Sequence, residues 1–118
     1  MLDPAQAVGV GGAVGALLRH LVSEVVDAGD YPLGTAAVNV LGSFVLALVS
    51  FAAVGGHLGL LLGTGLAGSF TTFSSFSYET VRLWETGKRR HALLHASTMF
   101  VGAIAAIGLA HGVVDVLG

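Results

Sequence analysis

Long apolar stretches, separated by short polar breaks, take up nearly the whole chain. Four of them, residues 5–26, 33–54, 58–84 and 91–117, approach or exceed the roughly 20 residues that a helix needs to cross a membrane. None shows the strict alternation of a membrane-spanning strand, and helices are the other structure that satisfies its own backbone in lipid. The pattern therefore predicts an all-α membrane protein in which residues 1–118 form a single integral membrane domain with four transmembrane helices.

The third stretch changes character halfway along. Residues 58–67 are apolar and rich in glycine, whereas residues 68–79 read Gly-Ser-Phe-Thr-Thr-Phe-Ser-Ser-Phe-Ser-Tyr-Glu. Glycine costs roughly 1 kcal/mol in a helix interior relative to alanine, so several glycines together favour an interruption whose backbone groups can hold an ion. Close helix packing explains the same glycines, because small residues let backbones approach. The dense hydroxyls must face protein, water or an ion, and this stretch is the expected functional centre.

Small residues also recur at helical spacing in the first stretch, where Ala7, Gly11 and Gly15 fall on one face. This spacing predicts tight association of that face with another helix, within one bundle or between subunits.

The distribution of charged residues predicts how the chain is oriented in the membrane. Only 10% of the residues are charged and the formal net charge is −2, with no basic cluster that would indicate a nucleic-acid partner. Basic residues set the topology of a membrane protein from short loops, which face the cytoplasm when they carry lysine and arginine. The connection between the third and fourth stretches is predicted to lie in the cytoplasm and both termini outside, because it holds four of the five basic residues: Arg82, Lys88, Arg89 and Arg90.

Three side chains in the apolar stretches are candidates for contact with an anion. Phe73 and Phe76 lie three residues apart, and the positive edges of their rings can favour an anion without trapping it. An aromatic pair in a membrane helix more often serves ordinary packing, but here six serine and threonine hydroxyls surround the rings. Asn39 is the only asparagine, and its amide can donate two hydrogen bonds to a dehydrated anion or can join two helices.

Charged and titratable residues leave further alternatives. Arg19 lies inside the first stretch, where it can face an aqueous vestibule or extend its charge toward the membrane surface. Glu79 can line a vestibule or pair with Arg82. His91 and His95 have the spacing of metal ligands, but without a nearby carboxylate or thiol they are expected at the membrane interface. The chain lacks a Gly-x-Ser-x-Gly elbow, so an enzyme is not expected.

Ordered motifs in three successive stretches resemble the Fluc fluoride channels, also called CrcB proteins. The resemblance covers nearly the whole chain. The motifs are Gly-Ala-Val-Gly-Ala-Leu-Leu-Arg at 12–19, Pro-Leu-Gly-Thr at 32–35 followed by Val38, Asn39 and Gly42, and Gly-Ser-Phe-Thr-Thr-Phe-Ser-Ser-Phe at 68–76 followed by Glu79.

The resemblance implies a fold and a function. The subunit would pair with a second one in an antiparallel, dual-topology dimer, with two pores that export fluoride passively from the cytoplasm across the cell membrane and lower fluoride toxicity. The third helix would be broken near Gly68–Thr71, where the backbone carbonyls of Gly68 and Thr71 would hold a structural sodium ion, Na+, at the dimer interface. The implied pore residues are Asn39, Phe73 and Phe76, with Thr72, Ser74 and Glu79 on a polar track and Arg19 as a vestibule residue.

The chain also departs from the family pattern. It has Gly68-Ser69 where the family has paired glycines, and it lacks the tyrosine that the family often has in the fourth helix. A dual-topology homodimer should show little bias of basic residues, and this chain shows a strong one. We therefore predict a heterodimer with a paralogous subunit of opposite orientation as an alternative assembly.

Two other functions stay open. The chain could be a non-conducting, structural subunit of such a heterodimer. A small multidrug-type, proton-coupled exporter would need a carboxylate deep in the first helix, whereas Glu24 lies near the end of that helix.

Overall fold

The computed structural model describes residues 2–26 and 31–118, and within these ranges the regular elements are helices. Three helices are long and apolar enough to cross a membrane: α1 (Pro4–Val26), α2 (Leu33–Phe51) and α6 (Arg89–Leu117). The third of the four crossings in chain order lies between α2 and α6 and consists of shorter pieces. These pieces are α3 (Gly56–Gly59), the π-helix η1 (Leu60–Ala67), α4 (Gly68–Phe70) and α5 (Phe73–Glu85).

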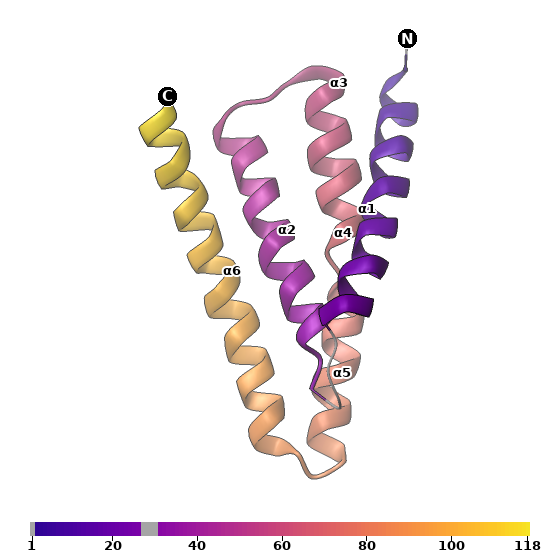
Figure 1. Ribbon diagram of the computed structural model, residues 1–118, viewed down its shortest axis with the longest axis vertical. Helices are drawn as coiled ribbons and strands as arrows, with labels where there is room; N and C mark the ends of the chain where they lie inside the picture. Colours follow the sequence, from indigo (N-terminus) through magenta and orange to yellow (C-terminus); the bar gives the residue numbers. More distant parts are fainter. Residues whose placement is uncertain (1, 27–30) are drawn as a thin grey trace.

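The four crossings run side by side along the bundle (Figure 1). Both chain ends lie at one end of the bundle with the connection between α2 and α3, and the connection between α5 and α6 lies at the opposite end. The prediction of an all-helical membrane protein with four crossings agrees with this arrangement. The basic residues at the α5–α6 connection are thus separated from both termini by the length of the bundle.

The second helix is shorter than its apolar pattern predicts, because it ends at Phe51 instead of Val54. Ala53 adopts the left-handed conformation, with φ of 55°. The amide of Val54 then donates to the carbonyl of Val49 and that of Ala53 to Ser50, which closes the helix in a Schellman motif. Glycine is usual at this left-handed position, so an alanine there gives no readable stop signal.

The smallest side chains form the contact between α1 and the third crossing. The buried residues of α1 are Ala7, Gly11 and Gly15, which are those of the predicted small-residue face. A Cβ atom on Gly11 would overlap the carbonyl of Leu61, and one on Gly65 would lie 2.7 Å from the carbonyl oxygen of Val8. Backbone therefore packs on backbone here, and both explanations of the glycines hold: close packing in η1 and an interruption further along.

Large apolar side chains lie mostly on the outside of this single chain. Leu17, Phe100 and Val101 are between 63% and 71% exposed, whereas the buried apolar residues are largely alanines. This distribution is typical of a membrane bundle, where small residues bring helices together and large ones face lipid or another subunit.

Candidate functional site

The third crossing is interrupted at Thr71 and Thr72. Both residues are extended, Thr71 at φ −83° and ψ 162° and Thr72 at φ −149° and ψ 124°, between the end of α4 and the start of α5. The interruption lies at the end of the predicted Gly68–Thr71 region. In lipid, the peptide groups that leave a helix need other partners.

Asn39 on α2 supplies those partners for Thr72. Its Nδ2 donates to the carbonyl oxygen of Thr72 at 2.8 Å, and its Oδ1 accepts from the amide of Thr72 at 2.7 Å. A second Nδ2 hydrogen bond goes to the sulfur of Met99 on α6, at 3.5 Å. The asparagine thus joins α2, the break and α6. Only its contact with Met99, a weak acceptor, is readily exchanged for another ligand.

The hydroxyl of Thr72 begins α5 as its N-cap. Thr72 Oγ1 accepts from the amide of Ser75 at 3.2 Å and lies 3.4 Å from the hydroxyl of Ser74. The positive end of the helix dipole and the free amides of the first turn therefore lie at the break, an arrangement that favours an anion.

Two phenylalanine rings follow the break on α5. The centroids of Phe73 and Phe76 are 6.1 Å apart with planes inclined at 50°, and Phe76 lies 5.4 Å from the ring of His95 on α6. Phe73 is 79% exposed on the surface of the single chain. The rings thus follow the hydroxyls of the break along α5, and the Phe73 side of this row is open in the single chain.

Glu79 and His95 meet one turn beyond Phe76. The Nε2 atom of His95 lies 3.9 Å from Glu79 Oε1, and the glutamate side chain is 30% exposed. The sequence predicts only that His95 lies near the membrane interface, and in the structure the residue is 0% exposed between helices. His91 is exposed and contacts the ring of Tyr31.

The predicted metal ligands, Gly68 and Thr71, are on the α4 side of the break. A continuous helix would direct the amide of Thr72 to the carbonyl of Gly68, but this amide donates to Asn39 instead. The Gly68 carbonyl accepts only a 3.4 Å bond from the Thr71 hydroxyl within the described ranges. Oxygen donors of this kind suit a hard cation.

Arg19 is half-buried on α1. Its guanidinium has no hydrogen bond or ion pair to the residues that the structure describes, so the structure does not join it to the other candidates.

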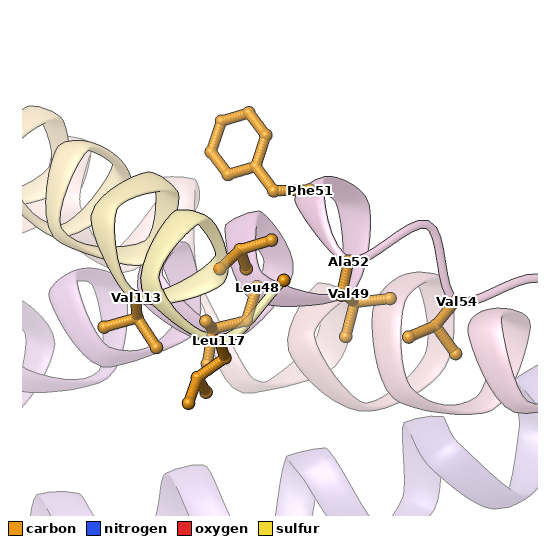
Figure 2. Close-up of a pocket in the computed structure, with 9 residues that line it drawn as sticks. Leu48, Val49, Phe51, Ala52, Val54, Val113 and Leu117 are labelled. Carbon is orange, nitrogen blue, oxygen red and sulfur yellow. The ribbon is translucent and has the colours of Figure 1, made fainter.

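A separate hollow of about 600 Å³ lies between the ends of α2 and α6, away from the break (Figure 2). Its lining side chains are all apolar and include Leu48, Phe51 and Val113. Such a surface offers no hydrogen bond to a dehydrated ion, so the hollow is not a candidate for the ion path.

Sequence reasoning missed two contacts that shape the site. Ser69 donates from its hydroxyl to the carbonyl of Gly12 at 2.8 Å and thereby fastens α4 to α1. Met99 faces the amide of Asn39 from α6. Neither has a sequence signal, because each depends on a partner that is distant along the chain.

Comparison with known proteins relates the chain to one family. A family model described as CrcB-like protein, Camphor Resistance (CrcB), matches residues 6–112. The fluoride-specific ion channel FluC 2 of Haloarcula marismortui is 51% identical over 98% of this chain and 98% of that protein. The fluoride-specific ion channel FluC 1 of Halobacterium salinarum is 47% identical over 91% and 90%. The FluC protein of Thermosipho melanesiensis is 42% identical over 84% and 86%.

Proposed function

This chain belongs to the CrcB family, and we propose that it forms a fluoride-selective ion channel through which fluoride leaves the cytoplasm down its electrochemical gradient. The observation that carries the proposal is the interruption at Thr71 and Thr72, which places the start of α5 and its hydroxyls beside the paired rings of Phe73 and Phe76. The relatives named fluoride-specific channels support fluoride as the ion.

The chemical task is to replace the water around a small anion. An isolated charge in a medium of low dielectric is penalised by tens of kcal/mol, so neutral donors must take over stepwise. The hydroxyls of Thr72 and Ser74 and the dipole of α5 supply such donors at the break, and the ring edges of Phe73 and Phe76 continue the path. Each contact is weak enough for the ion to leave, which conduction requires.

Asn39 acts in this mechanism chiefly as a positioning residue. Its hydrogen bonds to Thr72 hold the break in shape, and the Nδ2 hydrogen that faces the Met99 sulfur is the one that can turn to a passing anion. Glu79 lies at the far end of the rings from the break and limits how strongly an anion is held there.

The assembly we propose is an antiparallel dimer. One chain leaves Phe73 and Ser74 exposed, and a second chain would cover this open flank and exclude water from it. The carbonyls of Gly68 and Thr71 would hold a sodium ion where the two breaks meet, and the ion would supply positive charge that stabilises the interface. These residues provide the oxygen donors that such a cation prefers.

We further propose that the basic α5–α6 connection faces the cytoplasm in the cell membrane. Because that bias is one-sided, the partner is a paralogous chain inserted in the opposite direction. The numbered names FluC 1 and FluC 2 among the relatives are consistent with more than one such chain in an organism.

Fluoride efflux from liposomes tests the function. Vesicles containing the purified complex of this chain with a co-expressed paralogous partner are loaded with potassium fluoride, and release is followed with a fluoride electrode after a potassium ionophore is added. We expect fluoride but not chloride to leave, and we expect Phe76→Ala to lower the rate at least about tenfold through the loss of its ring edge.

The matched control is Phe100→Ala, which removes an aromatic ring that is 71% exposed on α6, and its rate should equal that of the unchanged protein. Chloride efflux without fluoride efflux would refute the proposed function. Rapid fluoride efflux from this chain alone would instead refute the need for a paralogous partner.

A further inference from the structure

We infer that His95 is the donor that α6 contributes to the fluoride path, and that it shares a proton with Glu79 so that fluoride flux rises as the pH falls. The inference rests on the proposed function and adds to it a specific residue and a dependence on pH. It follows from the position of the buried His95 side chain, whose ring nitrogens make no hydrogen bond to the described residues.

His95 is 0% exposed, and neither of its ring nitrogens has a hydrogen-bond partner among the described residues. Buried polar atoms are nearly always hydrogen-bonded in proteins, and an exception usually marks a missing water or ion or a functional group. An imidazole always carries at least one N–H donor. This donor is therefore held inside the bundle without a hydrogen-bond acceptor from the part of the chain that the structure describes.

The surroundings of His95 place it on the anion path. Its ring lies 5.4 Å from that of Phe76, which in turn lies 6.1 Å from Phe73 at the break. The path therefore continues from the hydroxyls through two rings to a buried imidazole. An anion that passes Phe76 reaches a buried imidazole whose N–H has no hydrogen-bond acceptor among the described residues.

Few titratable groups of residues 2–26 and 31–118 approach His95. Glu79 on α5 is the nearest, at 3.9 Å, and the ring of Tyr31 lies 5.9 Å away. His91 lies one turn earlier on α6 and is exposed. Its ring contacts the same Tyr31 ring. The helix α2, which packs against α6, has no titratable side chain.

Arg82 and Glu85 are the charged residues that follow Glu79 on α5, and both are exposed to solvent in this chain. Among the described residues, Glu79 and His95 are thus the titratable pair closest to the ring of Phe76. With the carboxylate ionised and the imidazole neutral, the pair carries one negative charge and repels an anion. One added proton brings the pair to zero net charge, whichever side chain holds it, and leaves N–H donors on the imidazole.

The test compares fluoride efflux from liposomes between about pH 8 and about pH 5, the interval in which histidine changes charge. Hydrogen fluoride crosses bare lipid, so protein-free vesicles at each pH give the background. We expect the unchanged protein to conduct faster at low pH. His95→Leu should lose at least about tenfold in rate, because the donor is gone.

Two further variants separate the donor from the proton. His95→Gln keeps an N–H donor but does not titrate, so we expect conduction within about threefold of the unchanged protein and a flat pH profile. Glu79→Gln should also flatten the profile. His111→Gln changes an exposed histidine near the other end of α6 and should leave both rate and profile unaltered.

A rate and pH profile for His95→Leu equal to those of the unchanged protein would overturn the inference while leaving the proposed function intact. A pH slope that persists in both His95→Gln and Glu79→Gln would overturn the shared proton. NMR of labelled histidine gives a readout that does not need flux. Addition of sodium fluoride, but not sodium chloride, should shift the His95 imidazole resonances and leave those of His111 in place, and the absence of such a shift would contradict binding.

Discussion

Two hydrogen bonds join the side-chain amide of Asn39 to both main-chain polar groups of Thr72, across 33 positions of sequence. They satisfy the amide that the interruption leaves without a helical partner, and they give a further donor to the carbonyl with which α5 begins. Asn39 is therefore part of the backbone structure of the third crossing as much as a residue on the ion path.

Asn39→Asp is expected to weaken both stability and conduction. The carboxylate still accepts from the Thr72 amide but can no longer donate to the Thr72 carbonyl, which costs about 1–3 kcal/mol, and its charge repels the anion. Thermal unfolding in detergent and fluoride efflux measure the two effects. Ser50→Ala, at the exposed far end of α2, serves as the control, and equal behaviour of both variants would contradict the role of Asn39.

Removal of the α5 cap should act locally. Thr72→Ala loses the hydroxyl that accepts from the amide of Ser75, at a cost of about 1 kcal/mol, and takes one donor from the path. Thr72→Ser retains both functions and should unfold and conduct almost as the unchanged protein does. If the alanine and serine variants behave alike, the hydroxyl has neither role.

A single methyl group at the contact between α1 and the third crossing should destabilise the bundle. The Cβ of Gly15→Ala would overlap the Leu66 carbonyl and the Ser69 hydroxyl, and overpacking of this kind costs about 1–3 kcal/mol. Gly9→Ala is a matched substitution on the same helix, where the new Cβ meets nothing within 4 Å. A lower unfolding temperature for Gly15→Ala alone is expected, and equal values would contradict the close packing.

Orientation can be read with single cysteines, since the natural chain has none. We expect His57→Cys to react with an impermeant maleimide in intact cells, and Glu85→Cys to react only after the membrane is opened. Both positions are exposed and lie at opposite ends of the bundle. Half-labelling of each from outside would show that the chain inserts in both directions and would remove the argument for a paralogous partner.

The helices could be predicted because they depend on local sequence, whereas the position of the break near Gly68–Thr71 was implied by the resemblance to the Fluc channels. Apolar length sets the crossings, the Ala7, Gly11 and Gly15 spacing sets the packing face, and the change from glycines to hydroxyls marks the interruption. The end of α2 could not be predicted, because Ala53 takes a conformation that its side chain does not favour.

The contacts of the site were harder to predict because they join residues on different helices. The sequence shows that Asn39 is unusual in its segment, but not that Thr72 and Met99 are its partners. His95 was expected at the membrane surface because spacing along one helix does not reveal what covers it. Only the packing of α5 on α6 places Glu79 and Phe76 against its ring.

The glycine contact between α1 and η1 has a consequence for how this molecule can change over time. Where the two main chains touch, there is no room for a side chain larger than a hydrogen atom, so almost no substitution is tolerated at these glycines. The outward faces, by contrast, accept any apolar residue that suits the surrounding lipid or a neighbouring subunit. Sequence changes should therefore accumulate on the outward faces while the glycine contact stays constant. Descendants of this protein can then acquire new partner subunits without changing the interior of the bundle.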